Sequence, residues 1–322
     1  MDPIIARLRG LVTMAATPFT RNGIDEEKFA AFVEWQISAG ADGIIVGGQT
    51  GEASTLTQAE RERLLRTAVE TGRKRAPIVG AVIANGTDHA VELAKAASAC
   101  GADAIAITTP YYNKPTQDGV FRHFEAVARV VDSALLILND PARAAIDVKL
   151  ETMTRLAAIP SIAGVIEMAG DAERASDIAR LFGNRFIQLC GRDTAALAFS
   201  GAGGIGWVSS IANVAPDLCA SLVAACRRRD EREAHAIQRL LAPVMESLAL
   251  ETEPAAIKHL LAIAHGWSAE VRLPLAPVSR AAAERLDRAF AALRNVATRA
   301  ATSTRSSPER GFPRRAVAAI AR

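Results

Sequence analysis

Three short segments repeat one local pattern along the chain: AGADGI (residues 39–44), CGADAI (100–105) and SGAGGI (200–205). In each segment a glycine follows a stretch with helical periodicity and precedes a short apolar run. Glycine tolerates the left-handed conformation that ends a helix, and the small residues after it allow a tight turn into a strand. The repeat therefore predicts a recurring unit of helix and strand.

Short apolar runs rich in β-branched residues alternate with amphipathic helical stretches from Leu11 to Ser210. Strands that alternate with helices in this way pair in parallel and are apolar on both faces. Eight such units close a barrel more readily than they extend an open sheet, so we predict an α/β fold, a (β/α)8 TIM barrel. The expected strands cover residues 11–19, 43–48, 77–83, 104–110, 134–139, 162–168, 185–191 and 204–210.

Only helical patterns follow the last expected strand. They cover residues 215–228, 231–249, 254–265 and 279–296. The first completes the eighth unit of the barrel, and the other three form a C-terminal helical appendage. We therefore expect a barrel over residues 1–228, an appendage over 229–296 and a basic, disordered tail over 297–322.

The tail is expected to be dispensable for the fold. It carries six arginines and one glutamate and is interrupted by Pro308, Gly311 and Pro313. Its last residues, AVAAIAR, are too few for a stable isolated helix. We expect a chain truncated after Val296 to keep its melting temperature in scanning calorimetry. A large drop would show that the tail packs on the body or on a neighbouring subunit.

The composition is that of an ordinary globular chain, with 50% hydrophobic and 23% charged residues and a net formal charge of +3. No apolar run reaches the about 18 residues of a membrane-spanning helix, and the N-terminus lacks a signal-peptide pattern. We therefore expect a cytoplasmic protein with no membrane partner. The two tyrosines and three tryptophans are not interleaved with basic residues, so no nucleic-acid partner is expected either.

Neither a metal nor a cofactor is expected. The four cysteines form no CxxC pair, and the five histidines form no HExxH pattern. The segment GAGGIG (residues 201–206) matches the glycine spacing of a dinucleotide-binding loop. It follows a helix and opens a strand, however, whereas such a loop must follow a strand and open a helix. We interpret it as a close-packed turn.

Candidate functional residues gather where the expected strands end, because the chemistry of such barrels lies at the C-terminal ends of the strands. GGQTGEASTL (47–56) combines glycines that let a ligand approach the backbone with the hydroxyl of Thr50. A helix-capping box of Thr57 and Glu60 explains the end of this stretch but not its glycines. TTPYYNKPTQDG (108–119) holds both tyrosines, and NDPARAA (139–145) places Arg143 where its guanidinium can hold a carboxylate.

These stretches, with two more in the appendage, resemble the dihydrodipicolinate synthase / N-acetylneuraminate lyase family over roughly residues 8–296. The motifs are TGEASTL (50–56), TPYYNKPTQDG (109–119), NDPAR (139–143), EPAAIK (253–258) and RLPLAP (272–277). The resemblance implies a TIM barrel, usually a homotetramer, that needs no cofactor. It also implies binding of pyruvate or a related 2-oxo acid, with a lysine of the sixth strand forming a Schiff base.

The chain departs from the family pattern at the lysine itself. The segment AGVIEM (163–168) carries Ile166 at the lysine position, and isoleucine has no amine to form an imine. The tyrosine and the first threonine that relay protons in the family correspond to Leu138 and Gln49. Of the six lysines in the chain, Lys149 is nearest in sequence and should point away from the barrel axis. These linked losses indicate abandoned Schiff-base chemistry.

Three functions remain open. The chain is a carbon–carbon or carbon–oxygen lyase, or a synthase, that acts on a 2-oxo acid without an imine. Alternatively it is a silent 2-oxo-acid sensor, or a structural subunit of a mixed oligomer; in each case we expect a dimer or tetramer. Tyr112 and Glu167 are the candidate acid–base groups. The expected substrate-binding residues are Gln49, Thr50, Gly51, Arg143, Gly191 and Val208.

Overall fold

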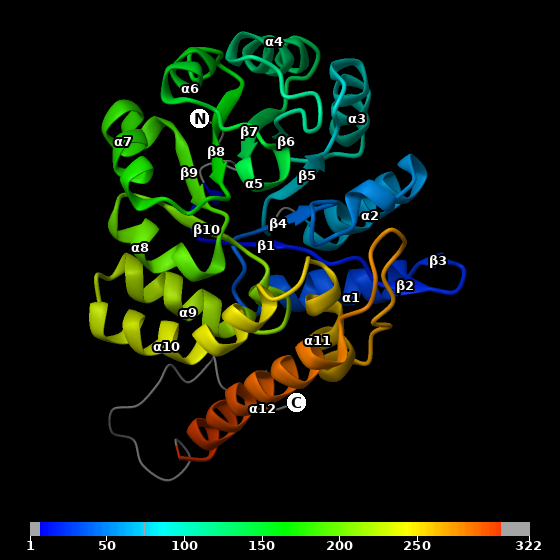
Figure 1. Cartoon of the computed structure of the whole chain (residues 1–322), viewed down its shortest axis with the longest axis vertical. Helices are drawn as coiled ribbons and strands as arrows, with labels where there is room; N and C mark the ends of the chain where they lie inside the picture. The colour runs from blue at the N-terminus through cyan, green and yellow to red at the C-terminus, as the bar shows by residue number, and fades with distance from the viewer. Residues whose placement is uncertain (1–6, 74, 304–322) are drawn as a thin grey trace.

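A computed structural model describes residues 7–73 and 75–303 of the chain. Eight parallel strands close into a barrel, with helices around the outside (Figure 1). Around the barrel the strands follow the order β1, β10, β9, β8, β7, β6, β5, β4, and β4 pairs with β1. Their bounds are β1 (Leu11–Met14), β4 (Gly43–Val46), β5 (Ile78–Val82), β6 (Ala104–Thr108), β7 (Ala134–Asn139), β8 (Ile162–Glu167), β9 (Ile187–Cys190) and β10 (Gly206–Ser209).

The predicted barrel is confirmed, and the first strand is the one whose length was wrong by most. It ends at Met14 rather than at residue 19. The backbone N–H of Ala16 donates to the side chain of Asn213 at 2.9 Å instead of to a neighbouring strand. The chain then forms an unpredicted antiparallel hairpin of β2 (Phe19–Thr20) and β3 (Gly23–Ile24). The hydrogen bond from the Ala16 backbone to the Asn213 side chain thus ends the pairing of β1 before residue 19.

Helices fill the connections between the strands and then continue beyond the barrel. Their bounds are α1 (Glu26–Ser38), α2 (Gln58–Gly72), α3 (Thr87–Ala99), α4 (Gln117–Ala128), α5 (Pro141–Ala144), α6 (Leu150–Leu156), α7 (Ala172–Phe182), α8 (Ala196–Gly201), α9 (Pro216–Arg227), α10 (Glu231–Leu248), α11 (Ala255–His265) and α12 (Arg280–Ser303). Two of the three repeated glycines, Gly40 and Gly101, have φ values of 106° and 88°. The third, Gly201, is the last residue of α8, and the positive φ of 105° lies two residues later at Gly203. The helix-ending turn that the repeat predicts is thus confirmed in the first two segments and shifted by two residues in the third.

The alternation of side chains along each strand produces two apolar layers. One layer fills the barrel and includes Met14, Ile45, Leu138, Ile166 and Val208. The other lies between the strands and the surrounding helices. Residues next to an interior position therefore face the helices. This alternation decides which strand residues reach the mouth of the barrel.

Helices α10, α11 and α12 lie together beside α9 and α1 (Figure 1). Helix α12 continues to Ser303, so the boundary expected after Val296 falls inside a helix. The remainder of the predicted tail, 304–322, lies outside the described residues. Among the helices that the structure describes, none is long and apolar enough to cross a membrane.

Candidate functional site

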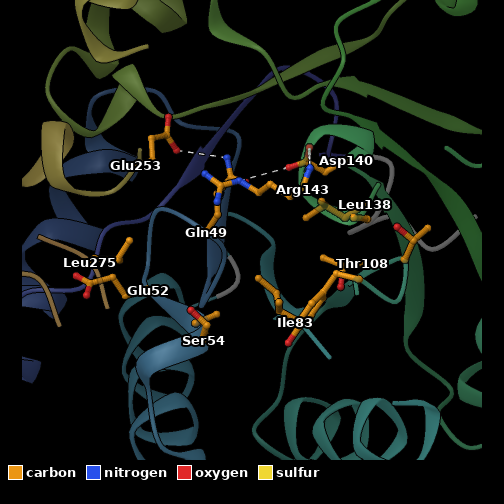
Figure 2. Close-up of a pocket in the computed structure, with 14 residues that line it drawn as sticks. Gln49, Glu52, Ser54, Ile83, Thr108, Leu138, Asp140, Arg143, Glu253 and Leu275 are labelled. Atoms are coloured by element: carbon orange, nitrogen blue, oxygen red, sulfur yellow. Dashed lines mark hydrogen bonds and ion pairs between the residues drawn. The ribbon is translucent and has the colours of Figure 1, made fainter. Parts of the chain in front are cut away.

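Two adjoining cavities open at the C-terminal ends of the strands and share Gln49, Asp140, Arg143 and Glu253. The smaller has a volume of about 240 Å³ and the larger about 630 Å³. The smaller cavity is also lined by Glu52, Ala53, Ser54, Ile83, Thr108, Thr109, Tyr111, Leu138, Ala144 and Leu275 (Figure 2). The larger one extends past Met168, Gly191, Arg192, Asp193, Ser210 and Glu251. A small polar molecule fits either space.

Arg143 is positioned by α5, the short helix that follows β7. Asp140 caps this helix by accepting the backbone N–H of Arg143, and Pro141 occupies its first turn. The Arg143 Nε lies 3.6 Å from Asp140 Oδ2, a long ion pair, and the side chain is about half exposed at 48%. It extends across the mouth toward Gln49 and Glu253 (Figure 2). The guanidinium is therefore accessible to an anionic ligand from both cavities.

Donors of the turn after β4 form hydrogen bonds with other residues of the chain. The buried Thr50 hydroxyl donates to Glu253 Oε2 at 3.0 Å, and the Gln49 amide donates to the same oxygen at 3.3 Å. The backbone N–H of Gly51 donates to the Gly48 carbonyl at 3.1 Å. The donors assigned to a substrate carboxylate from the sequence thus already have partners in this structure.

Aliphatic side chains occupy interior positions near the ends of β7 and β8. Leu138 and Ile166 are direct neighbours in the strand register, and both face the barrel interior. Leu138 lines the smaller cavity, and Ile166 is fully buried beside it. Among the described residues that line the two cavities, none is a lysine.

Lys258 contacts Glu52, a residue that lines the smaller cavity. Its ammonium forms a buried ion pair with Glu52, donates to the Glu270 carbonyl at 2.7 Å and lies 3.7 Å from the centre of the Phe19 ring. Burial lowers the pKa of Lys258, and Glu52 opposes that shift. Lys28, Lys95, Lys114 and Lys149 lie on outer helices or loops and line neither cavity.

The structure separates Glu167, one of the two candidate acid–base groups, from the mouth. Glu167 follows the inward-facing Ile166 and so faces the helix layer. It accepts from Arg174 Nε at 2.9 Å and from Asn139 Nδ2 at 3.0 Å. Burial raises the pKa of Glu167, while Arg174 opposes the shift. Through these bonds Glu167 links β8 to β7 and α7. It lines neither cavity and therefore does not face a ligand there.

Of the two adjacent tyrosines, Tyr111 lines the smaller cavity and Tyr112 does not. Tyr112 has a φ of 68° and an exposed fraction of 88%, so its backbone turns its ring outward. The sequence carries no signal that tells the two rings apart. Gly191 lines the larger cavity as expected, whereas Val208 is buried in the barrel interior and lines neither cavity.

Several polar groups at the mouth were not singled out from the sequence. The Thr108 and Thr109 hydroxyls line the smaller cavity and have no hydrogen-bond partner among the described residues. The Asp193 carboxylate accepts from Trp207 Nε1 at 3.0 Å and from two backbone amides. Burial, followed by the nearby charge of Glu253, raises the pKa of Asp193 to about 7. The position of Asp193 beside the expected Gly191 is the signal that could have identified it.

The mouth combines an accessible guanidinium, unpartnered hydroxyls and an aliphatic wall. The guanidinium can pair with a carboxylate, and the hydroxyls can donate to a further oxygen of a small ligand. Within residues 7–73 and 75–303, no group of three histidine, cysteine, aspartate or glutamate side chains is placed to hold a metal ion.

Comparisons with known proteins agree with this architecture. The 4-hydroxy-tetrahydrodipicolinate synthase of Bartonella bacilliformis is 43% identical over 285 residues, which cover 88% of this chain and 97% of that protein. Its counterpart in Methylobacterium radiotolerans is 42% identical over 274 residues, 85% of this chain and 92% of that protein.

Solved structures give the same result. The chloride-inhibited dihydrodipicolinate synthase of Acinetobacter baumannii, complexed with pyruvate, has a TM-score of 0.86 at 33% identity and covers 89% of this chain and 99% of its own. The dihydrodipicolinate synthase of Aquifex aeolicus has a TM-score of 0.86 at 32% identity and covers 88% of this chain and 97% of its own. Since residues 7–293 also match the model of the dihydrodipicolinate synthetase family, the chain belongs to that family.

Proposed function

We propose that this chain binds a small 2-oxo acid at the barrel mouth and acts on it as a lyase or synthase without a lysine imine. One observation carries the proposal. The cavity of about 240 Å³ at the strand ends presents a guanidinium and free hydroxyls, but no amine, among its described lining residues. The names of the relatives and the pyruvate complex of one solved neighbour support the ligand class.

Each part of the ligand has a complementary group in the smaller cavity. Arg143 offers a planar fork of N–H donors to the carboxylate. The Thr108 and Thr109 hydroxyls supply the donors that a carbonyl oxygen needs, and Leu138 and Ile83 give the carbon chain an apolar wall. Without an imine, the negative charge that develops on the carbonyl oxygen must be stabilised by such donors directly.

Tyr111 takes the acid–base role that was expected of Tyr112, because it is the tyrosine that lines the cavity. A general acid or base must lie within hydrogen-bond reach of the proton that it transfers. Glu167 does not meet this requirement, since its carboxylate is bound by Arg174 and Asn139 on the helix side of β8.

A silent 2-oxo-acid sensor is the second candidate. Leu138 is paired with Ile166, and the described residues that line the smaller cavity include no amine; both observations favour it. The two functions differ in turnover. If nuclear magnetic resonance spectroscopy detects a product formed from pyruvate and an aldehyde, the lyase or synthase is supported. Binding without any product supports the sensor, and absence of both supports the structural subunit.

We expect pyruvate to raise the melting temperature of the chain and Arg143→Ala to abolish that rise. A ligand that binds only the folded state stabilises it by mass action, and Arg143 is the cation that the smaller cavity offers to the carboxylate. Differential scanning fluorimetry measures both. Arg122→Ala is the matched control, because Arg122 is 76% exposed on α4 and lines neither cavity, and it should leave the rise intact. A rise that survives in Arg143→Ala would contradict the proposed binding mode.

A further inference from the structure

The C-terminal appendage places a carboxylate of its own inside the mouth. We propose that Glu253 is a specificity-determining residue: it fills the place at Thr50 where a ligand carboxylate would bind and so directs that carboxylate to Arg143. The inference rests on the proposed function, because it names how the 2-oxo acid is oriented. In this proposal a residue of the C-terminal appendage, rather than of the barrel strands, determines where the ligand carboxylate binds.

Glu253 accepts two side-chain hydrogen bonds from the turn after β4. A threonine hydroxyl has one hydrogen to donate. Thr50 directs it to Glu253 Oε2 at 3.0 Å, and the Ser210 Oγ, 3.3 Å from Thr50 Oγ1, supplies the hydrogen that Thr50 accepts. The Gln49 amide donates to the same Glu253 oxygen. A second carboxylate would therefore have to displace Glu253 from the Thr50 hydroxyl.

Three backbone amides of this turn are also paired within the chain. The N–H groups of Gly51 and Ala53 both donate to the Gly48 carbonyl, at 3.1 and 3.2 Å, and that of Glu52 donates to the Gln49 carbonyl at 3.2 Å. Amides that are paired within the chain do not bind an anion without breaking those bonds. The glycine-rich turn thus offers a ligand less than its sequence suggests.

Charge reinforces the hydrogen bonding. Asp140, Asp193, Glu251 and Glu253 all line the larger cavity. A ligand carboxylate at Thr50 would lie in contact with Glu253, and like charges at contact distance repel strongly in a partly buried site. Among the described residues, the ion-pair partner of the Arg143 guanidinium is Asp140, at the long distance of 3.6 Å, so this guanidinium is the better partner for an incoming anion.

The test measures the dissociation constant of pyruvate by titration calorimetry on the full chain. Glu253→Ala frees the Thr50 and Gln49 donors, and we expect the dissociation constant to fall at least about tenfold. Binding should then persist in the Arg143→Ala/Glu253→Ala double variant and be lost again when Thr50→Val is added. Thr50→Val alone should change the dissociation constant less than about twofold, since Thr50 does not meet the ligand in the wild-type chain.

Glu251→Gln is the matched control. It removes a carboxylate from the same cavity, but the Glu251 carboxylate accepts from the Ser279 backbone and not from Thr50. Its effect should stay well below that of Glu253→Ala. Glu253→Gln, which keeps the size of the side chain and removes its charge, should also bind pyruvate more tightly, and it replaces Glu253→Ala if thermal melting shows that the alanine variant does not fold.

The outcomes separate the inference from the proposed function. An unchanged dissociation constant in both Glu253 variants, or loss of binding in the Arg143→Ala/Glu253→Ala double variant, overturns the role of Glu253 while wild-type binding still stands. A wild-type chain that does not bind pyruvate contradicts the proposed function. Even then, binding that appears in Glu253→Ala and disappears with Thr50→Val supports the inference, and no binding in either Glu253 variant overturns it.

Discussion

Treatment of the wild-type chain with pyruvate and borohydride is expected to leave its intact mass unchanged. Borohydride traps an imine only where a lysine amine has condensed with the carbonyl group, and the described lining of both cavities contains no lysine. The position that resembles the family's lysine carries the fully buried Ile166. Intact-mass spectrometry before and after reduction measures the result.

Ile166→Lys supplies the positive control. Its amine would lie beside Leu138 among aliphatic side chains, where burial lowers a lysine pKa and leaves the amine nucleophilic. We expect this variant to gain the mass of one reduced pyruvate adduct without efficient turnover, because Leu138 and Gln49 cannot relay protons. An adduct on any lysine of the wild-type chain, with Lys258 the first to inspect by peptide mapping, would contradict the proposed imine-free route.

Lys258→Met is expected to lower the free energy of unfolding by about 3–5 kcal/mol. The Lys258 ammonium is fully buried between the Glu52 carboxylate, the Glu270 carbonyl and the Phe19 ring. Methionine preserves most of the volume but leaves Glu52 charged and buried, with the Arg272 backbone N–H as its remaining donor at 2.9 Å. Urea denaturation measures the loss.

Two comparisons show whether the loss comes from the pair itself. The double variant Glu52→Gln/Lys258→Met should be destabilised by less than the sum of the single variants, because the uncompensated charge is gone. Arg280→Ala breaks an exposed ion pair with Glu284 on α12, in which Arg280 is 93% exposed, and should change stability by about 0.5 kcal/mol or less. A loss in Lys258→Met no larger than in Arg280→Ala would show that the buried pair is not a stabilising contact.

Local patterns in the sequence are sufficient for the barrel and for several of its details. The expected strand 134–139 coincides with β7, and the capping box of Thr57 and Glu60 forms as predicted at the start of α2. Both depend on neighbours in sequence, through side-chain alternation and helix-end hydrogen bonds. Arg143 reached the mouth as expected for the same reason, since it closely follows the end of a strand.

The expectations that failed at the site depend on orientation. The strand Ile162–Glu167 is apolar on both faces up to its last residue, so its pattern does not show whether Ile166 or Glu167 points inward. The pairing of β8 with β7 and β9 decides it, and Ile166 faces the interior. The neighbouring tyrosines differ likewise through the backbone, because the positive φ of Tyr112 is a property of the folded loop.

The amino-acid sequence alone is sufficient to predict the (β/α)8 architecture and the strand ends that surround the mouth, and it shows that the segment 162–168 contains no lysine. The tertiary structure is needed to show which distant side chains come into contact at the mouth. Glu253 contacts Thr50 across a separation of 203 residues, and Lys258 contacts Glu52 across 206. Periodicity records the neighbours of a residue along its own helix or strand. It carries no information about which distant side chains packing brings together, and those contacts set the charge and the free donors of the site.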